Sequence, residues 1–326
     1  MAGEIWVLVE QWRGRISDIT YEVLALGREV AEALAGSLQA VVLGPGAGES
    51  IFSLGAADGA LMVEHSALAE PVPEVYALAL AQIIPQRQPQ ALLIPQTNVT
   101  MELGPLLAAR LAVPFLNSCR DVQVTDGRPV ARCILYGGKV EASVTPQSAP
   151  AVFGILPGVR PPEQGRVERA PAVRALSVDL PTEFPLRFRG YTELEAGDVD
   201  ITRENVLVAV GRGIQRPENV ALAEELAAAL GGAVCGSRPV IDQRWLPPSR
   251  QVGTSGMIVK PQLYLALGIS GAPEHAQGMK EAALIVAINT DPRAPIFDIA
   301  HYGVVGDLLE IVPAMTTRVK QGKQAA

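Results

Sequence analysis

Four loops rich in glycine and hydrogen-bonding side chains follow one another in the last third of this 326-residue chain. They are the segments VGRG (210–213), GSRP (236–239), QVGTSG (251–256) and GISGAPEH (268–275). Glycine lets a backbone approach a phosphate closely, while Ser, Thr, Arg and His supply hydrogen-bond donors. Their clustering predicts one extended, anionic, hydrogen-bonding ligand, for which a dinucleotide is the natural candidate.

The loop 268–275 carries the strongest of these signals. It follows the apolar run 263–267, which has the composition of a buried strand, and Pro273 stands where a helix would place its first residue. A strand, a small-residue turn and a helix N-terminus together favour an anion, although an ordinary strand-to-helix turn has the same composition. Neither this loop nor 211–216 has the Gly-x-Gly-x-x-Gly spacing, so a standard nicotinamide site is not supported.

Three side chains in these loops have chemistry that suits a redox ring. His275 could donate to an electron-rich edge, Arg238 could face a ring or phosphate that becomes anionic, and Ser255 could offer its hydroxyl to a ring nitrogen. The alternatives are a structural histidine, a surface cation and a turn residue.

No arrangement of side chains typical of an enzyme accompanies these loops. The sequence lacks Gly-x-Ser-x-Gly, His-Glu-x-x-His and any metal-spaced Cys/His set. Asp242, Asp291, Asp298 and Asp307 could serve acid–base chemistry, but no base or nucleophile is paired with them. The pattern favours a protein that holds a redox cofactor and passes electrons, with the chemistry carried by the cofactor.

The elements that position these loops alternate between strands and helices. In the first 115 residues we expect strands at 5–9, 38–43, 59–63 and 91–94, and helices from Ile19 to about Leu38, at 72–84 and at 101–111. Such alternation predicts a mostly parallel sheet. Between residues 121 and 156, the pairs Asp126-Gly127 and Gly137-Gly138 separate short apolar runs and predict an antiparallel ribbon.

A proline-rich stretch at 157–200 precedes a second alternating region. We place the domain boundary in the acidic segment 193–200, which gives an N-terminal domain at 1–198 and a C-terminal domain at 199–326. In the second domain we expect strands at 205–210, 233–234, 263–267, 284–288 and 309–312, and helices at 219–230, 272–280 and 299–308.

The composition limits the remaining classes of function. A net charge of −7 with scattered basic residues argues against nucleic-acid binding, and the longest apolar runs are of strand length, too short for membrane insertion. The N-terminal residues lack the pattern of a secretion signal, and three widely spaced cysteines fit a reducing compartment. We expect a soluble, cytoplasmic protein.

The C-terminal third resembles the α subunit of electron-transfer flavoprotein, the family that includes the FixB proteins. The matching text is GSRPVIDQRWLPPSRQVGTSGMIVKPQLYLALGISGAPEH, followed by IVAINTDPRAPIFDIAHYGVVGDLLEIVPAM. The N-terminal domain matches more loosely, through IWVLVE and ALLIPQTN. The resemblance implies a Rossmann-like, doubly wound C-terminal domain that binds FAD, an N-terminal α/β domain that faces the partner, and a heterodimer with a β subunit.

The resemblance also implies a set of cofactor contacts. Arg238 would lie against the flavin ring and favour its anionic reduced forms, Ser255 would reach the flavin N5 region, and His275 would reach the N1/O2 edge. Asn289, Asp307 and Leu308 would serve the adenosine end. The complete set of matching positions is Arg212, Ser237, Arg238, Val252, Gly253, Thr254, Ser255, Ser270, Gly271, Ala272, Pro273, Glu274, His275, Asn289, Asp307 and Leu308.

Two positions depart from the family pattern. The family often has Gln-Thr where this chain has Thr254-Ser255, and Gln where it has Glu274. The first change keeps a hydroxyl but removes a methyl group, and the second places a carboxylate near the cofactor. Both changes are expected to bear on the redox properties of the flavin.

The expected function is that of an FAD-containing carrier. It would take electrons from flavin dehydrogenases of the acyl-CoA dehydrogenase type, as in fatty acid β-oxidation, and pass them to a quinone oxidoreductase or another acceptor. One alternative is the α subunit of an electron-bifurcating flavoprotein that uses NADH and holds a second FAD near the β subunit. Alternatives of another class are a nucleotide-binding enzyme and a nucleotide-sensing regulatory subunit.

Overall fold

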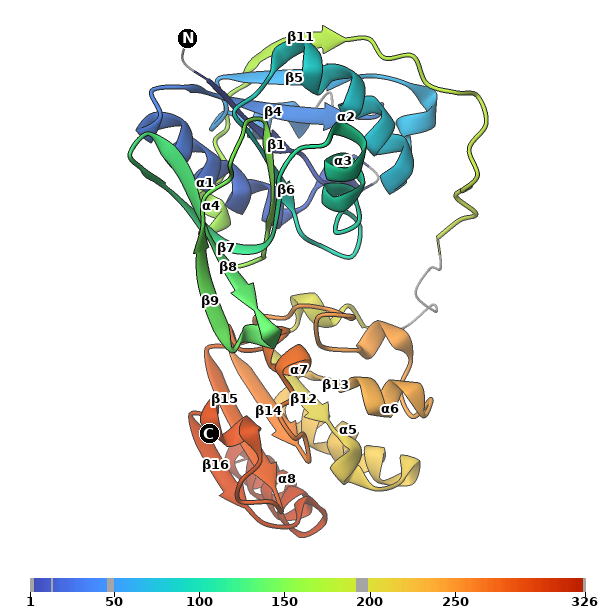
Figure 1. Ribbon diagram of the computed structural model, residues 1–326. Helices are drawn as coiled ribbons and strands as arrows, with labels where there is room; N and C mark the ends of the chain where they lie inside the picture. Colours follow the sequence, from blue (N-terminus) through green and yellow to red (C-terminus); the bar gives the residue numbers. More distant parts are fainter. Residues whose placement is uncertain (1–2, 13, 46–49, 192–198, 325–326) are drawn as a thin grey trace. The chain divides into compact units, whose positions relative to one another are not determined.

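The computed structural model describes residues 3–12, 14–45, 50–191 and 199–324. The chain forms two compact units, Met1–Gly190 and Tyr191–Ala326 (Figure 1). The domain boundary that we expect at residue 198 falls at the end of the segment 192–198, outside the described residues. Within the described ranges, every helix is too short or too polar to cross a lipid bilayer.

The N-terminal unit is built on a nine-stranded sheet. Its seven neighbouring strands from β11 to β7 are parallel, and β8 and β9 extend the sheet in antiparallel fashion. The order is β11 (Ala172–Leu176), β5 (Gly59–Val63), β4 (Ser37–Leu43), β1 (Glu4–Leu8), β6 (Ala91–Pro95), β10 (Ala151–Ile155), β7 (Phe115–Thr125), β8 (Arg128–Leu135) and β9 (Val140–Val144). The predicted mixture of a parallel sheet and an antiparallel ribbon is confirmed.

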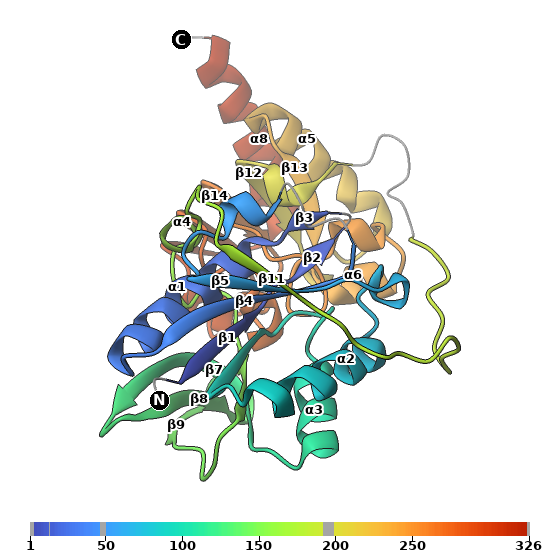
Figure 2. The same ribbon diagram turned by 90° about the horizontal axis from the view of Figure 1, so that it is seen from above.

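Helices cover both faces of this sheet because its parallel strands are apolar on both sides. Along β1, Ile5 and Val7 point into the core on one face, while Trp6 and Leu8 point into the core on the other. Helix α1 (Asp18–Ala33) covers the first face, with α4 (Pro162–Gly165) beside it, and α2 (Pro73–Arg87) and α3 (Leu103–Leu111) cover the second (Figure 2). A small hairpin of β2 (Gln11–Trp12) and β3 (Arg15–Ile16) lies outside the sheet.

Two expectations for this unit are corrected, and one strand is added. The first helix ends at Ala33 rather than near Leu38, because Ser37–Leu43 is already strand β4. Residues 151–155 fall in the expected ribbon, but they form β10, a buried parallel strand between β6 and β7. Strand β11, in the proline-rich stretch, joins the edge of the sheet next to β5. Both strands depend on distant partners that a local pattern does not reveal.

The C-terminal unit is a five-stranded, fully parallel sheet. The order is β13 (Ala233–Gly236), β12 (Val206–Val210), β14 (Leu263–Leu267), β15 (Leu284–Asn289) and β16 (Tyr302–Val305). The chain moves outward from β12 first to β13 and then, in the other direction, to β14. The carboxyl ends of β12 and β14 therefore flank the point where the strand order reverses, where open α/β sheets bind their ligands.

The two faces of this sheet are covered differently. Helices α5 (Val220–Leu230) and α8 (Leu308–Gln324) pack on one face against Val208, Val210 and Leu265. The other face, which includes Tyr264 and Ala266, is buried by the loops around Val252 and by residues that follow the short helix α7 (Pro273–Gln277), among them Met279. The α/β class with a Rossmann-like C-terminal domain is confirmed.

The last two elements of this unit were predicted with the wrong type. The expected helix at 299–308 is replaced by strand β16, whose backbone pairs with β15. The expected strand at 309–312 lies inside α8. Leu308, Val312 and Met315 recur at helical spacing against the core, so the short apolar run is part of a helical stripe. A four-residue window cannot distinguish these two patterns.

Candidate functional site

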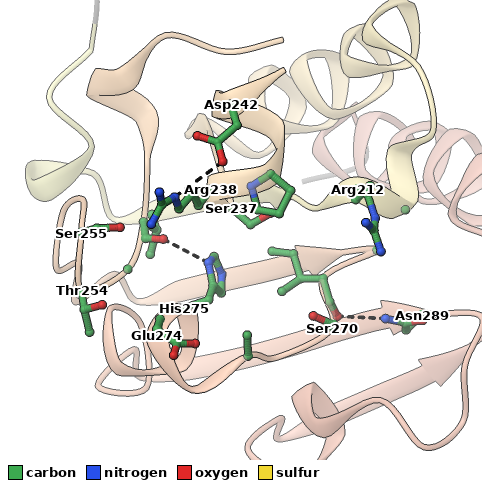
Figure 3. Close-up of a pocket in the computed structure, with 17 residues that line it drawn as sticks. Arg212, Ser237, Arg238, Asp242, Thr254, Ser255, Ser270, Glu274, His275 and Asn289 are labelled. Carbon is green, nitrogen blue, oxygen red and sulfur yellow. Dashed lines mark hydrogen bonds and ion pairs between the residues drawn. The ribbon is translucent and has the colours of Figure 1, made fainter. Parts of the chain in front are cut away.

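A cavity of about 730 Å³ lies at the carboxyl ends of the strands in the C-terminal unit. Its walls come from the segments that follow β12, β13 and β14, from the end of β15 and from the segment before β14 (Figure 3). This position corresponds to the reversal of strand order, and the volume is in the range of small-molecule sites. The four glycine-containing loops are brought together here.

Most of the predicted site residues line this cavity. They are Arg212, Ser237, Arg238, Val252, Gly253, Thr254, Ser255, Ser270, Ala272, Glu274, His275 and Asn289. The predicted residues Gly271, Pro273, Asp307 and Leu308 are not among the lining residues, and their contacts with a cofactor stay predictions. The structure adds Gly213, Pro239, Gly268 and Ile269, which belong to the predicted loops but not to the predicted cofactor contacts, and it adds Asp242.

Glycines in two of the loops allow the loops to pack against each other. A Cβ atom on Gly268, whose φ is +62°, would lie 2.7 Å from the Cα atom of Gly213. A Cβ atom on Gly211 would lie 2.3 Å from the carbonyl oxygen of Gly268. The segments after β12 and β14 thus meet backbone to backbone at the reversal point. At these positions glycine serves loop packing, whereas the sequence analysis assigned it to close approach of a phosphate.

Arg238 begins the short helix α6 (Arg238–Asp242) and lies at one end of the cavity, near Thr254 and Ser255 (Figure 3). Its Nε atom is 3.5 Å from Oδ2 of Asp242, and both side chains are more than half exposed. The helical spacing of four residues brings them onto one side of α6. Asp242, considered from the sequence as an acid–base candidate, is therefore the counter-ion of Arg238.

The loop 251–257 forms the wall beside Arg238. Gly253 adopts a φ of +140°, which favours glycine, and the Thr254 amide donates to the Glu274 carbonyl at 2.9 Å. The Gln251 side-chain amide donates to the Ser255 oxygen at 2.9 Å. Because this oxygen accepts, the Ser255 hydroxyl can donate its own hydrogen to a ligand.

His275 lines the cavity but is itself buried. Its Nδ1 atom is 3.1 Å from the Val252 carbonyl oxygen, and its Nε2 atom is 2.9 Å from the Tyr264 hydroxyl. Burial lowers the pKa of His275 from 6.5 to about 4. The ring is therefore neutral near pH 7, and both of its nitrogens are bonded within the protein.

The hydrogen bonds of His275 bear on the role that we expect from the resemblance. A carbonyl oxygen can only accept, so Nδ1 carries the single ring hydrogen, and Nε2 accepts from Tyr264. In this arrangement His275 has no N–H group to donate to the N1/O2 edge of a flavin. His275 lines the cavity, and its contact with the N1/O2 edge of a flavin stays a prediction.

Arg212, Ser270 and Asn289 lie toward the other end of the cavity (Figure 3). Asn289 donates through Nδ2 to the Ile269 carbonyl at 2.9 Å and accepts the Asp291 amide at 2.9 Å. Asp307 accepts the Leu309 amide at 2.9 Å and so caps the start of α8. Asn289 and Asp307 therefore have structural roles alongside the contacts with the adenosine end that we expect of them.

The charges that line the cavity are balanced. Two arginines, Arg212 and Arg238, and two carboxylates, Asp242 and Glu274, line it, while His275 is neutral. Helix α7 contains only five residues, so it contributes less of a helix dipole than the expected helix at 272–280. An anionic ligand would therefore depend mainly on the two arginines and on backbone and hydroxyl donors.

The fold and the site define a parallel α/β nucleotide-binding domain joined to a second α/β domain. Residues 200–280 match the electron transfer flavoprotein FAD-binding domain, and residues 5–181 match the electron transfer flavoprotein domain. The chain belongs to the electron-transfer flavoprotein family, as a relative of its α subunits and FixB proteins.

Three relatives cover nearly the whole chain at 34% identity. One is the acryloyl-CoA reductase electron transfer subunit beta of Anaerotignum propionicum, with 99% of this chain and 97% of the relative aligned. Another is protein FixB of Clostridium saccharobutylicum, with 97% and 96% aligned. A third is the electron transfer flavoprotein subunit alpha of Bacillus subtilis (strain 168), with 98% of both chains aligned.

Proposed function

We propose that this chain holds one FAD in the cavity of its C-terminal unit and works as the α subunit of a two-chain electron carrier. The observation on which the proposal depends is the convergence of the four loops on one cavity at the reversal of strand order, within the region that matches the FAD-binding domain. When bound, FAD would supply the redox chemistry by accepting and releasing electrons.

The residues of the cavity fit a ligand with a ring at one end and a nucleotide at the other. Arg238, Thr254 and Ser255 would hold the flavin ring, with Arg238 as the cation and Ser255 as a hydroxyl donor. Arg212, Ser270 and Asn289 would hold the pyrophosphate and adenosine portions. The charge of Arg238 would favour the ring once it has gained negative charge, and the nearby Asp242 would moderate that effect.

The names of the relatives support a proposal about the partners. Several are named as subunits, and the one from Anaerotignum propionicum is named as an electron transfer subunit of an acryloyl-CoA reductase. We infer that this chain pairs with a β subunit and exchanges electrons with flavin dehydrogenases that act on acyl-CoA substrates. A quinone oxidoreductase or another acceptor would receive the electrons.

Co-expression of the chain with its β subunit tests the proposal. A purified complex with the absorbance spectrum of bound flavin and one FAD per heterodimer is the expected result, and two FAD molecules would indicate the bifurcating form. Gly268→Ala, which obstructs the meeting of the two loops, should release FAD, whereas Gly231→Ala, in open space at the end of α5, should retain it. A colourless wild-type complex that also fails to take up added FAD would refute the proposal.

A further inference from the structure

Two buried thiols face each other where the antiparallel ribbon joins the parallel strands of the N-terminal unit. Cys119 on β7 and Cys133 on β8 are partners in the antiparallel register, and their Sγ atoms are 3.8 Å apart. Their exposed fractions are 0% and 4%. The third cysteine of the chain, Cys235, lies on β13 of the other unit. Neighbouring thiols held in a fixed register are the starting geometry for a disulfide.

The backbone around Cys119 permits such a bond. The Cys119 carbonyl accepts the Leu156 amide at 2.9 Å on the side of β10, so it is turned away from β8. Opposite residues that exchange no backbone hydrogen bonds have Cα atoms about 4.5 Å apart, with their side chains closer than in a hydrogen-bonded pair. A disulfide joins Cα atoms roughly 4.4–6.8 Å apart. Rotation about the two Cα–Cβ bonds can therefore bring the sulfurs to bonding distance with little movement of the strands.

The two thiols differ in how easily they lose a proton. Cys119 donates to the Leu116 carbonyl at 3.2 Å, and it can donate to the sulfur of Cys133 instead. The hydrogen bond from Cys119 lowers the pKa of Cys133, although burial opposes it. The same bond raises the pKa of Cys119, and burial adds to that effect. Because the thiolate is the reactive form, Cys133 is the attacking sulfur and Cys119 is the thiol that completes the bond.

We propose that Cys119 and Cys133 form a peroxide-sensitive dithiol, which closes to a disulfide and links the ribbon to the parallel strands. The Cys133 sulfur breaks the O–O bond of hydrogen peroxide and keeps one oxygen as a sulfenic acid, while the other oxygen leaves as water. The Cys119 sulfur then displaces that hydroxyl group, which leaves with the Cys119 hydrogen as a second water. The two sulfurs together lose two electrons, and the peroxide gains them.

The disulfide would tie down the outer part of the sheet. Strand β9 is outermost and pairs with β8, and β8 joins the sheet through β7. A bond between Cys119 and Cys133 therefore fixes the base of the whole ribbon. Local opening is easiest where strands are exposed, and β9 is largely exposed. Such opening admits a molecule as small as hydrogen peroxide, whereas a bulky thiol reagent is still excluded.

Peptide mass spectrometry of the heterodimer tests the proposal. The reduced complex is treated with hydrogen peroxide, its remaining thiols are alkylated in denaturant, and the chain is digested without reductant. Trypsin cuts after Arg120 and Arg132, so the peptides 111–120 and 133–139 stay joined only by a disulfide. We expect this joined pair, lighter by two hydrogens than the separate thiol peptides. Alkylation of all three cysteines after prolonged treatment, or a sulfinic acid at Cys133, would overturn the proposal.

Two serine variants separate the pair from general oxidation. In Cys133→Ser we expect Cys119 to remain a thiol under peroxide that oxidises it in the wild type. Cys235→Ser is the matched control, since Cys235 is also buried on a strand but has Ala209 as a register partner. This variant should form the Cys119–Cys133 disulfide as the wild type does. If Cys133→Ser does not fold, the joined peptides of the wild type decide the question by themselves.

The melting temperatures of the two forms give a second measurement. A cross-link between residues 119 and 133 closes a short loop in the unfolded chain, which should raise the melting temperature of the N-terminal unit by about 6–12 °C. Dithiothreitol should abolish this gain. An equal or lower melting temperature of the oxidised form would show that the strands do not accommodate the bond. A complex without FAD would refute the proposed function but would leave both measurements valid, because neither involves the cofactor.

Discussion

The charge balance at the Arg238 end of the cavity gives a prediction about redox potential. Arg238 Nε and Asp242 Oδ2 are 3.5 Å apart, and their side chains are 69% and 64% exposed. With such exposure, the dielectric response is close to that of water, where unit charges in contact interact by about 1 kcal/mol. For a one-electron couple this energy corresponds to roughly 40 mV. Removal of the Arg238 charge should therefore lower the first reduction potential of the bound flavin by roughly that amount.

The assay is spectroelectrochemical titration of the heterodimer with three variants. Arg238→Gln should lower the potential, and Asp242→Asn should raise it by a smaller amount, since Asp242 opposes the cation. Arg216→Gln is the control, because Arg216 is exposed in the same unit but does not line the cavity. High salt should reduce both shifts, since the Debye length falls to about 3 Å at 1 M. An Arg238→Gln potential equal to or above that of wild type would refute this electrostatic reasoning.

Three further predictions concern the protein itself. Gly268→Ala should destabilise the chain by about 2–4 kcal/mol, because it combines a left-handed φ with a backbone clash, while Gly231→Ala should cost only about 1 kcal/mol in urea unfolding. The pKa of His275 is about 4 in the folded protein and 6.5 in the unfolded chain. The stability that the neutral ring contributes is therefore present above pH 6.5 and is lost as the pH falls toward 4. Between pH 6.5 and pH 4 the free energy of unfolding should fall by roughly 3 kcal/mol. His275→Gln should therefore flatten the dependence of the melting temperature on pH. An unchanged slope in this variant would contradict the low pKa of His275. Finally, the three buried cysteines, among them Cys119 and Cys133 with Sγ atoms 3.8 Å apart, should resist a thiol reagent until the chain is denatured, and rapid labelling in the native protein would argue against their burial.

The sequence allowed most of the fold to be predicted, because alternating strands and helices have distinct periods. Strand β5 and the two hairpin turns of the ribbon were found from local pattern and turn residues. Strands β10, β11 and β16 and helix α8 were not found in this way. Their identity depends on contacts with other parts of the chain, which a short local pattern does not contain. A short apolar run such as 309–312 becomes part of a helix only when a core is available for its stripe.

For the site, the sequence by itself determined the loops and the types of donor, since glycine, serine and arginine have the same intrinsic chemistry wherever they lie. Only the tertiary structure decided which atoms of these groups face the cavity. It packed Gly213 against Gly268 and engaged both nitrogens of His275, whereas the pairing of Asp242 with Arg238 follows from their spacing along α6. The physical reason is that a hydrogen bond or ion pair requires positions and directions, and these are fixed when strands distant in sequence become neighbours.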